Sequence, residues 1–168
     1  MKPILRLDNL SVDFSTELGT VQAVREISLS VNQGEILAIV GESGCGKTVL
    51  CKSVMKLLPR NAKLSGRVFV EGDELTHASE RKMQRLRGTL FSMLFQDPMT
   101  SLNPTIPVGK QIIEALLSHD AISQADAEKR AIELLELVGI DHPEERMALQ
   151  PHFFSGGMRQ RCVLAIAL

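Results

Sequence analysis

Apolar and polar residues alternate near the start of the chain, with the period of two that is typical of half-buried strands. The alternation runs through residues 10–14 and again through residues 27–31, and a turn around Gly19 separates the two segments. The apolar positions are Leu10, Val12 and Phe14 in the first segment and Ile27, Leu29 and Val31 in the second. We expect an antiparallel β part at the N-terminus.

A different pattern, an unbroken apolar run, occupies residues 36–40. Such a run is typical of a parallel strand that is covered on both faces. Apolar residues then recur at helical spacing from Thr48 onward, which predicts a helix that stops at Pro59. Shorter apolar runs predict a strand at residues 68–70 and a second buried segment at residues 90–95.

The periodicity becomes helical from residue 97 to about residue 152. Two amphipathic helices are expected there, with apolar faces at Val108, Ile112 and Leu116 and at Ala127, Ala131, Leu134 and Val138. Ser123 is a plausible N-cap of the second helix because Asp126 follows three residues later, and Gly139 stands where a left-handed C-terminal cap is expected. We expect this segment to be a helical insert in an α/β chain.

The net charge of the chain is close to zero, which excludes partners that are attracted by long-range electrostatics alone. The chain has 168 residues and a net charge of −1, from 19 basic and 20 acidic residues, so we expect no nucleic-acid partner. Its longest apolar stretches, residues 36–40 and 162–168, are far shorter than the ~20 residues of a membrane-spanning helix. The N-terminus carries no secretory signal pattern, and we expect a cytosolic location.

The cysteines and histidines form no recognisable metal or disulfide pattern. Three cysteines are odd in number and lack C-x-x-C spacing, and the four histidines are scattered. We therefore expect reduced thiols and no Cys/His metal cluster.

One segment does carry a specific chemistry. Residues 41–48 match G-x-x-x-x-G-K-[ST] in full, as Gly41, Glu42, Ser43, Gly44, Cys45, Gly46, Lys47 and Thr48. Glycines let backbone N–H groups face phosphate oxygens, Lys47 adds a cation for the β- and γ-phosphates, and Thr48 supplies a hydroxyl to Mg²⁺. With an expected strand before it and a helix after it, this loop predicts a binding site for ATP and Mg²⁺.

A second possible anion site lies near the C-terminal end. Ser155, Gly156 and Gly157 stand at the start of an apolar helix that contains Cys162, Val163, Ala165 and Ile166. Taken alone, they are an N-cap serine followed by two flexible glycines. The exposed N–H groups and the dipole of a helix start also bind anions, so a second phosphate-binding device is possible.

At these residues the chain resembles the ATP-binding cassette family, whose members carry an L-S-G-G-Q signature after a helical insert. Phe154 and Met158 replace the leucine and the glutamine and leave the S-G-G core intact. Residues 94–104 resemble the Q-loop of the subfamily that imports peptides and nickel, and residues 151–161 resemble its signature region.

This resemblance implies an α/β fold, a P-loop NTPase of the ABC type. Its expected parts are an N-terminal antiparallel β part, a partial parallel core sheet and an inserted helical subdomain. We expect residues 1–168 to form a single, C-terminally incomplete nucleotide-binding domain. Residues 1–96 would be its β-rich and P-loop part, residues 97–157 its helical subdomain, and residues 158–168 the start of the return to the core.

The resemblance also assigns roles to two further residues. It implies that Gln96 is a catalytic residue that senses Mg²⁺ and the γ-phosphate while coupling to a permease. Without that context Gln96 is a polar residue capping a strand. Phe14 falls where the family places an aromatic residue against adenine, although a core phenylalanine in an alternating strand explains it equally well.

The family resemblance further implies a homo- or heterodimer of nucleotide-binding subunits on the cytoplasmic face of the cell membrane. In that dimer, Ser155, Gly156 and Gly157 of one subunit would close over ATP held by Lys47 of the other. Transmembrane permease subunits and a substrate-binding protein would complete an importer of peptides or nickel. The alternatives are a non-transport cassette protein and a nucleotide-binding module without turnover.

The family's Asp and Glu after the signature helix, its D-loop and its switch histidine have no counterpart in these 168 residues. General acid–base catalysis is typically worth ~10² to 10⁴ in rate, so we expect little ATP hydrolysis by this chain alone. We expect the chain to be a shortened form of a longer subunit, in which the strand edge at residues 36–40 stays unpaired and favours aggregation.

Overall fold

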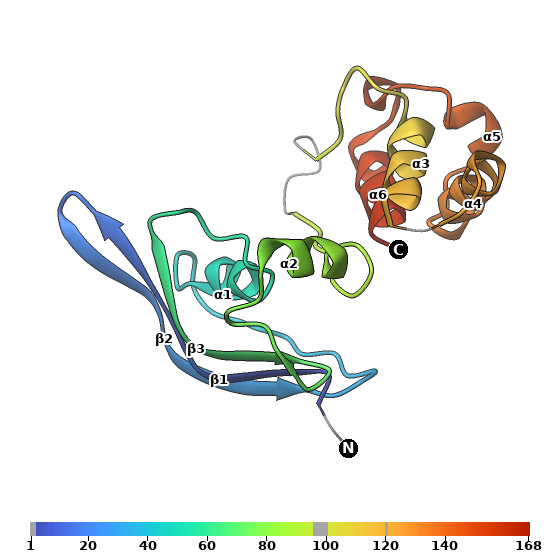
Figure 1. The fold of residues 1–168 in the computed structure, drawn as a ribbon. Coiled ribbons are helices and arrows are strands. Elements are labelled where there is room, and N and C mark those ends of the chain that lie inside the picture. Colours follow the sequence, from blue (N-terminus) through green and yellow to red (C-terminus); the bar gives the residue numbers. More distant parts are fainter. Residues whose placement is uncertain (1–2, 96–100, 120) are drawn as a thin grey trace. The chain divides into compact units, whose positions relative to one another are not determined.

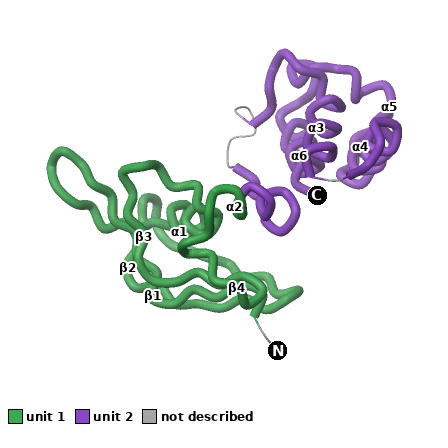
Figure 2. The backbone as a smooth tube through the Cα atoms, in the orientation of Figure 1, with its two compact units in different colours: residues 1–83 green, residues 84–168 purple. Residues whose placement is uncertain are grey.

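The computed structural model describes residues 3–95, 101–119 and 121–168. The chain forms two compact units, Met1–Met83 and Gln84–Leu168 (Figure 2). The predicted boundary at residue 96 lies outside the described residues and stays a prediction. Along the chain the elements are β1 (Leu5–Thr16), β2 (Gly19–Val31), α1 (Lys47–Val54), β3 (Ala62–Val70), β4 (Asp73–Glu74), α2 (Glu80–Leu86), α3 (Val108–His119), α4 (Gln124–Leu137), α5 (Pro143–Arg146), a 3₁₀ turn (Pro151–Phe153) and α6 (Gly156–Ala167) (Figure 1).

The first unit is built on an antiparallel sheet with the strand order β2-β1-β3-β4. Buried Leu10 and Val12 of β1 and buried Val24 of β2 belong to its core. Helix α1 lies against β1 and β2 in the same unit. The antiparallel N-terminal part expected from the alternating pattern is therefore confirmed.

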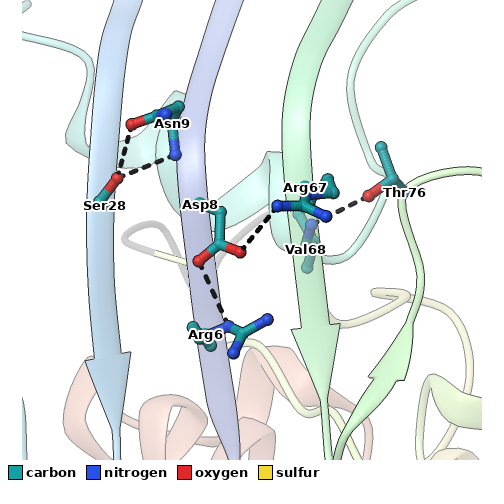
Figure 3. Close-up of polar contacts among 7 residues, drawn as sticks. All are labelled: Arg6, Asp8, Asn9, Ser28, Arg67, Val68 and Thr76. Atoms are coloured by element: carbon teal, nitrogen blue, oxygen red, sulfur yellow. Dashed lines mark hydrogen bonds and ion pairs between the residues drawn. The ribbon is translucent and has the colours of Figure 1, made fainter.

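Side chains hold the irregular parts of this sheet in place (Figure 3). Asn9 has a left-handed backbone with φ 48° where the β1–β2 register shifts, and its N–H donates to Ser28 Oγ at 2.9 Å. Ser28 Oγ in turn donates to Asn9 Oδ1 at 3.0 Å. On β3, the Val68 N–H donates to Thr76 Oγ1 at 2.9 Å, which ties the segment after β4 to the sheet.

Two arginines and an aromatic ring stabilise the exposed part of β1 and β3. The Asp8 carboxylate lies 3.2 Å from Arg6 Nε and 3.6 Å from a guanidinium nitrogen of Arg67 (Figure 3). Arg6 also stacks over the Phe69 ring, with its Cζ 4.2 Å from the ring centroid. Exposed ion pairs of this kind contribute little stability each, about 0–1 kcal/mol.

Helix α1 ends earlier than predicted, at Val54 rather than at Pro59. Lys56 adopts a left-handed backbone with φ 53°, and the Leu57 N–H donates to the Lys52 carbonyl at 2.9 Å. That arrangement closes the helix with a left-handed cap. The backbone after α1 stops the helix before the proline is reached.

The predicted parallel strand at residues 36–40 is not formed. No strand in the part of the chain that the structure describes pairs with this segment, and Ile36 and Val40 are 96% and 88% exposed. A β-strand needs a neighbour to accept and donate its backbone hydrogen bonds, and the apolar pattern alone does not supply one. The expected parallel part of the core sheet is therefore corrected, while the α/β class stands.

The apolar run at residues 90–95 is likewise neither a strand nor buried throughout. The N–H groups of Leu90 and Phe91 both donate to the Leu86 carbonyl, so the start of the run belongs to the turn that follows α2. Further along, Leu94 and Phe95 are exposed. A turn closed by the Arg87–Phe91 bridge has replaced the start of the expected extended segment.

The second unit is helical, as expected. Ser123 is the N-cap of α4 and accepts from the Asp126 N–H at 3.2 Å, and Gly139 follows the helix with φ 74°. Helices α3, α4 and α6 pack on one another around a buried core. Its members are Leu102, Val108, Ile112, Ile113, Ala127, Ala131, Leu134, Leu135, Val138, Ile140, Phe154, Cys162 and Ala165.

Cys162 is the buried thiol of this helical core. Burial raises the pKa of the Cys162 thiol to about 11 from an ordinary value of 9.0, and the nearby charges of Arg161 and Arg146 offset only part of that rise. Cys45 and Cys51, in the first unit, are exposed free thiols. The expectation of unpaired cysteines agrees with the structure.

Candidate nucleotide-binding site

The loop at residues 41–48 is seated on strand β2. Gly46 is the N-cap of α1 and has a left-handed backbone with φ 93°. A Cβ on Gly46 would clash with the carbonyl oxygen of Ala23 and would lie 3.5 Å from Val24 Cγ2. Glycine is therefore required at this position for two reasons, the left-handed backbone angle and the close approach of β2.

Lys47 folds back over the loop that precedes it. Its Nζ donates to the carbonyl oxygens of Gly41 at 2.8 Å and Glu42 at 2.6 Å. The same ammonium lies 3.4 Å from Cys45 Sγ. The positive charge is thus held directly at the loop, where a phosphate group bound by the loop amides would meet it.

The start of α1 provides the other half of an anion site. The Leu50 N–H makes the first helical bond, to the Gly46 carbonyl at 2.8 Å, and no side chain caps the N–H groups of the first turn. These groups carry the positive end of the helix dipole. Thr48, in the same turn, is exposed, so its hydroxyl is accessible from solvent. Together these groups can bind an anion and a cation coordinated to it.

Phe14 lies on β1 of the same unit, opposite Val21 of β2. Residues directly opposite each other in an antiparallel pair share one face of the sheet. Phe14 is half-buried and Val21 is largely exposed, so the pair presents an apolar surface two residues from the Ala23 seat of the loop. The contact of Phe14 with a base stays a prediction.

The Ser-Gly-Gly segment begins helix α6 in the second unit. Ser155 is its N-cap, and the Met158 N–H donates to Ser155 Oγ at 3.3 Å. Apart from its chain neighbours and the backbone of its own helix, a Cβ on Gly156 or Gly157 would meet no atom within 4 Å. Internal packing therefore does not demand these two glycines, and they leave the helix start open to an external group.

The predicted site residues fall in both units, and one of them is not described. Phe14 and residues 41–48 belong to the first unit, whereas Ser155, Gly156 and Gly157 belong to the second. Gln96 lies outside the described residues. Within the described ranges, no group of three or more His, Cys, Asp or Glu side chains could hold a metal ion. Of the two predicted Mg²⁺ ligands, Thr48 and Gln96, the structure describes Thr48.

Sequence analysis missed two residues of the site, Ala23 and Val24. Ala23 contributes only its carbonyl, and Val24 contributes a buried methyl group beside the loop glycine. Neither residue type carries a chemical signal, because the contact depends on how the hairpin passes beneath the loop. The apolar pattern of β2 predicted a strand, but it did not predict the contact between this strand and the loop at Gly46.

Comparison with known proteins identifies the family. A model of the family described as ABC transporter matches residues 24–168. The chain belongs to the ABC transporter family. The loop at residues 41–48 and the Ser-Gly-Gly start of α6 both lie within the matched range.

The most similar relatives include ATP-binding proteins of peptide transport. The chain is 52% identical to the oligopeptide transport ATP-binding protein OppD of Bacillus subtilis, over 98% of this chain and 47% of that protein. It is 51% identical to the dipeptide transport ATP-binding protein DppD of the same organism, over 100% of this chain and 51% of that protein. The chain thus spans about half the length of the curated relatives it matches.

Solved structures support the fold. The dimeric structure of the ATP-binding cassette MJ0796 in a post-hydrolysis state, bound to ADP and Pi, matches with a TM-score of 0.84 at 23% identity. The match covers 98% of this chain and 68% of that one. The predicted α/β cassette class is confirmed. None of the helices in the described ranges is both long and apolar enough to traverse a bilayer.

Proposed function

We propose that this chain is the nucleotide-binding part of an ABC importer subunit, and that residues 41–48 bind the triphosphate of ATP. The observation that carries the proposal is the seated loop. Gly46 rests on the Ala23 carbonyl, Lys47 Nζ lies against the loop carbonyls, and the uncapped start of α1 follows directly. Backbone amides, a cation and a helix dipole converge on one anion site.

The remaining site residues take supporting roles in this proposal. Phe14, with Val21 opposite it, forms the apolar surface against which adenine lies. The Thr48 hydroxyl coordinates Mg²⁺, which neutralises phosphate charge when bound, and Gln96 reaches the same ion. Gly41, Glu42, Ser43, Gly44 and Cys45 contribute backbone groups of the cradle.

The proposed assembly is a dimer of nucleotide-binding subunits on the cytoplasmic face of the membrane. Ser155, Gly156 and Gly157 of one subunit contact the γ-phosphate of ATP bound to the other. The open space at the two glycines of α6 supports this role, because it leaves room for an external group at the helix start. The names of the relatives support peptides as cargo. The proposed partners are transmembrane permease subunits and a substrate-binding protein.

Calorimetric titration with ATP tests the proposal. Lys47→Ala should weaken ATP binding at least tenfold, because charge-assisted bonds are worth about 1.5–3 kcal/mol. Lys129→Ala, which removes an exposed lysine from α4, serves as the matched control and should leave the affinity unchanged. Equal affinities for the wild type and Lys47→Ala, in protein with an unaltered far-UV spectrum, would overturn the proposal.

A further inference from the structure

Strand β2 is irregular at the point where the loop before α1 contacts it. Val12 of β1 pairs with Val24 of β2. The next residue of β1, Asp13, pairs with Gln22, so Ala23 is an extra residue on β2. An extra residue of this kind is a β-bulge, which bends the strand and changes the direction of its backbone groups. The carbonyl beneath the loop therefore belongs to a bulged residue.

A second bulge lies close by on the same strand. At this point the register places Arg25 and Glu26 of β2 opposite one residue of β1, Ser11. Glu26 has a left-handed backbone with φ 47°, which is sparsely populated by residues other than glycine. Its N–H donates to Ser11 Oγ at 2.8 Å. A side-chain hydroxyl of β1 thus holds the strained residue of this bulge in place.

The same arrangement occurs at a bulge of β1. Asn9 has φ 48°, and its N–H donates to Ser28 Oγ at 2.9 Å (Figure 3). Ser28 Oγ also donates to Asn9 Oδ1 at 3.0 Å. A Cβ on Gly66 of β3 would clash with the Asn9 carbonyl oxygen, so this bulge is also packed against β3. The two serines support their bulges in the same way, and the Glu26 bulge is the nearer of the two to Ala23.

The bulge beneath the loop also sets the register at the tip of the β1–β2 hairpin. Phe14 of β1 pairs with Val21 of β2. Val12, two residues before Phe14, pairs with Val24, three residues after Val21. Because side chains alternate along a strand and opposite residues share a face, the bulge keeps both valines of β2 on one face. Without the bulge, Gln22 would take the place of Val21 opposite Phe14.

We propose that Ser11 is a positioning residue for the loop that binds the triphosphate of ATP. Its hydroxyl fixes the Glu26 bulge, and this bulge holds the following part of β2 so that the Ala23 carbonyl lies directly beneath Gly46. Ser11 contacts no nucleotide in this scheme and acts only through the strand. The inference rests on the proposed function, which assigns the triphosphate to this loop.

The closeness of the contact between loop and strand is the reason why the position of β2 matters. Gly46 approaches the Ala23 carbonyl so closely that a single added methyl group would clash, so a small shift of the carbonyl must displace the loop. Without the Ser11 hydroxyl, the Glu26 N–H can bond only to water, and its strained backbone is free to relax. ATP must then order the loop as it binds, which lowers the affinity.

Calorimetric titration of the full chain with ATP tests the inference. Ser11→Ala should weaken ATP binding about threefold to tenfold, the range that the loss of one neutral hydrogen bond supports, and should speed amide exchange in residues 43–46. Ser11→Thr keeps a hydroxyl in the strand and should restore both properties. Adding Glu26→Gly to Ser11→Ala should recover part of the affinity, because glycine adopts the left-handed backbone without a bond to hold it.

Ser28→Ala is the matched control for a purely structural role. It removes the same kind of N–H acceptor and one further bond, but from the bulge at Asn9. It should lower the urea midpoint at least as much as Ser11→Ala does and leave the affinity for ATP unchanged. Wild-type affinity in Ser11→Ala, or equal losses of affinity in the two variants, would overturn the inference alone. A wild-type chain that binds no ATP would overturn the proposed function, and the inference with it.

Discussion

Gly44 and Gly46 have similar backbones but different surroundings. Both have positive φ values, 82° and 93°. A Cβ on Gly44 would meet nothing within 4 Å, whereas one on Gly46 would clash with the Ala23 carbonyl. The backbone angle alone costs an L-residue about 1–2 kcal/mol, and the contact at Gly46 adds a second penalty. The sequence motif does not distinguish the two glycines, whereas the structure shows a close contact with β2 at Gly46 and none at Gly44.

Alanine at these two positions should separate the two effects. Gly44→Ala should cost about 1–2 kcal/mol of stability, from backbone strain. Gly46→Ala should cost a further ~1–3 kcal/mol, because the loop must move off β2, and it should weaken ATP binding more. Urea unfolding and calorimetry of both variants provide the measurement. If both variants lose the same free energy of unfolding, the close contact between Gly46 and the Ala23 carbonyl is not energetically important.

At the scale of helices, Ser123 and Ser155 cap α4 and α6 in the same way. Each hydroxyl accepts from the N–H three residues later, at 3.2 Å and 3.3 Å. The two helices differ in the residues after the cap, because α4 continues with Gln124 and Ala125 and α6 with two glycines. One cap therefore serves the fold, and the other is proposed to serve nucleotide as well.

The two caps give a matched test of that proposal. Ser123→Ala and Ser155→Ala should each cost about 1 kcal/mol of stability, as the loss of an N-cap usually does. Only Ser155→Ala should reduce ATP-dependent dimerisation, measured by light scattering with and without ATP. Similar dimerisation of both variants would limit Ser155 to a structural role.

At the scale of the whole molecule, the two units carry different thiols. Cys45 and Cys51 of the first unit are exposed, whereas Cys162 of the second is fully buried between helices. The raised pKa of Cys162 means that the folded chain holds this proton more tightly than the unfolded chain does. Below pH 9.0 the thiol is protonated in both states, and between pH 9.0 and about 11 only the unfolded state ionises.

Stability of the second unit should therefore fall as the pH rises from 9.0 towards about 11. Cys162→Ala should lack this part of the pH dependence, although the small cavity it creates lowers its stability at every pH. Urea midpoints of both proteins, measured about one pH unit below 9.0 and again between 9.0 and about 11, provide the comparison. Parallel loss of stability in the two proteins would show that Cys162 does not ionise on unfolding.

The sequence alone determined the features that depend on local chemistry. Period-two alternation predicted the β1–β2 hairpin, and Ser123 and Gly139 marked the ends of α4. The motif at residues 41–48 predicted the loop that leads into α1, which is proposed to bind phosphate. Each of these signals acts within a few residues, through backbone angles, caps or side-chain periodicity, so the pattern contains the information that is needed.

Only the tertiary structure decided which segments find partners. The apolar runs at residues 36–40 and 90–95 both predicted buried segments, yet neither forms a strand, because strand formation requires a neighbour that the pattern does not encode. The same holds for the Ala23 carbonyl beneath Gly46 and for the Gln111 amide, which bonds to the backbone of Asn103 and Ile106. These contacts involve backbone atoms, which carry no signature of residue type, so they are visible only once the chain is folded.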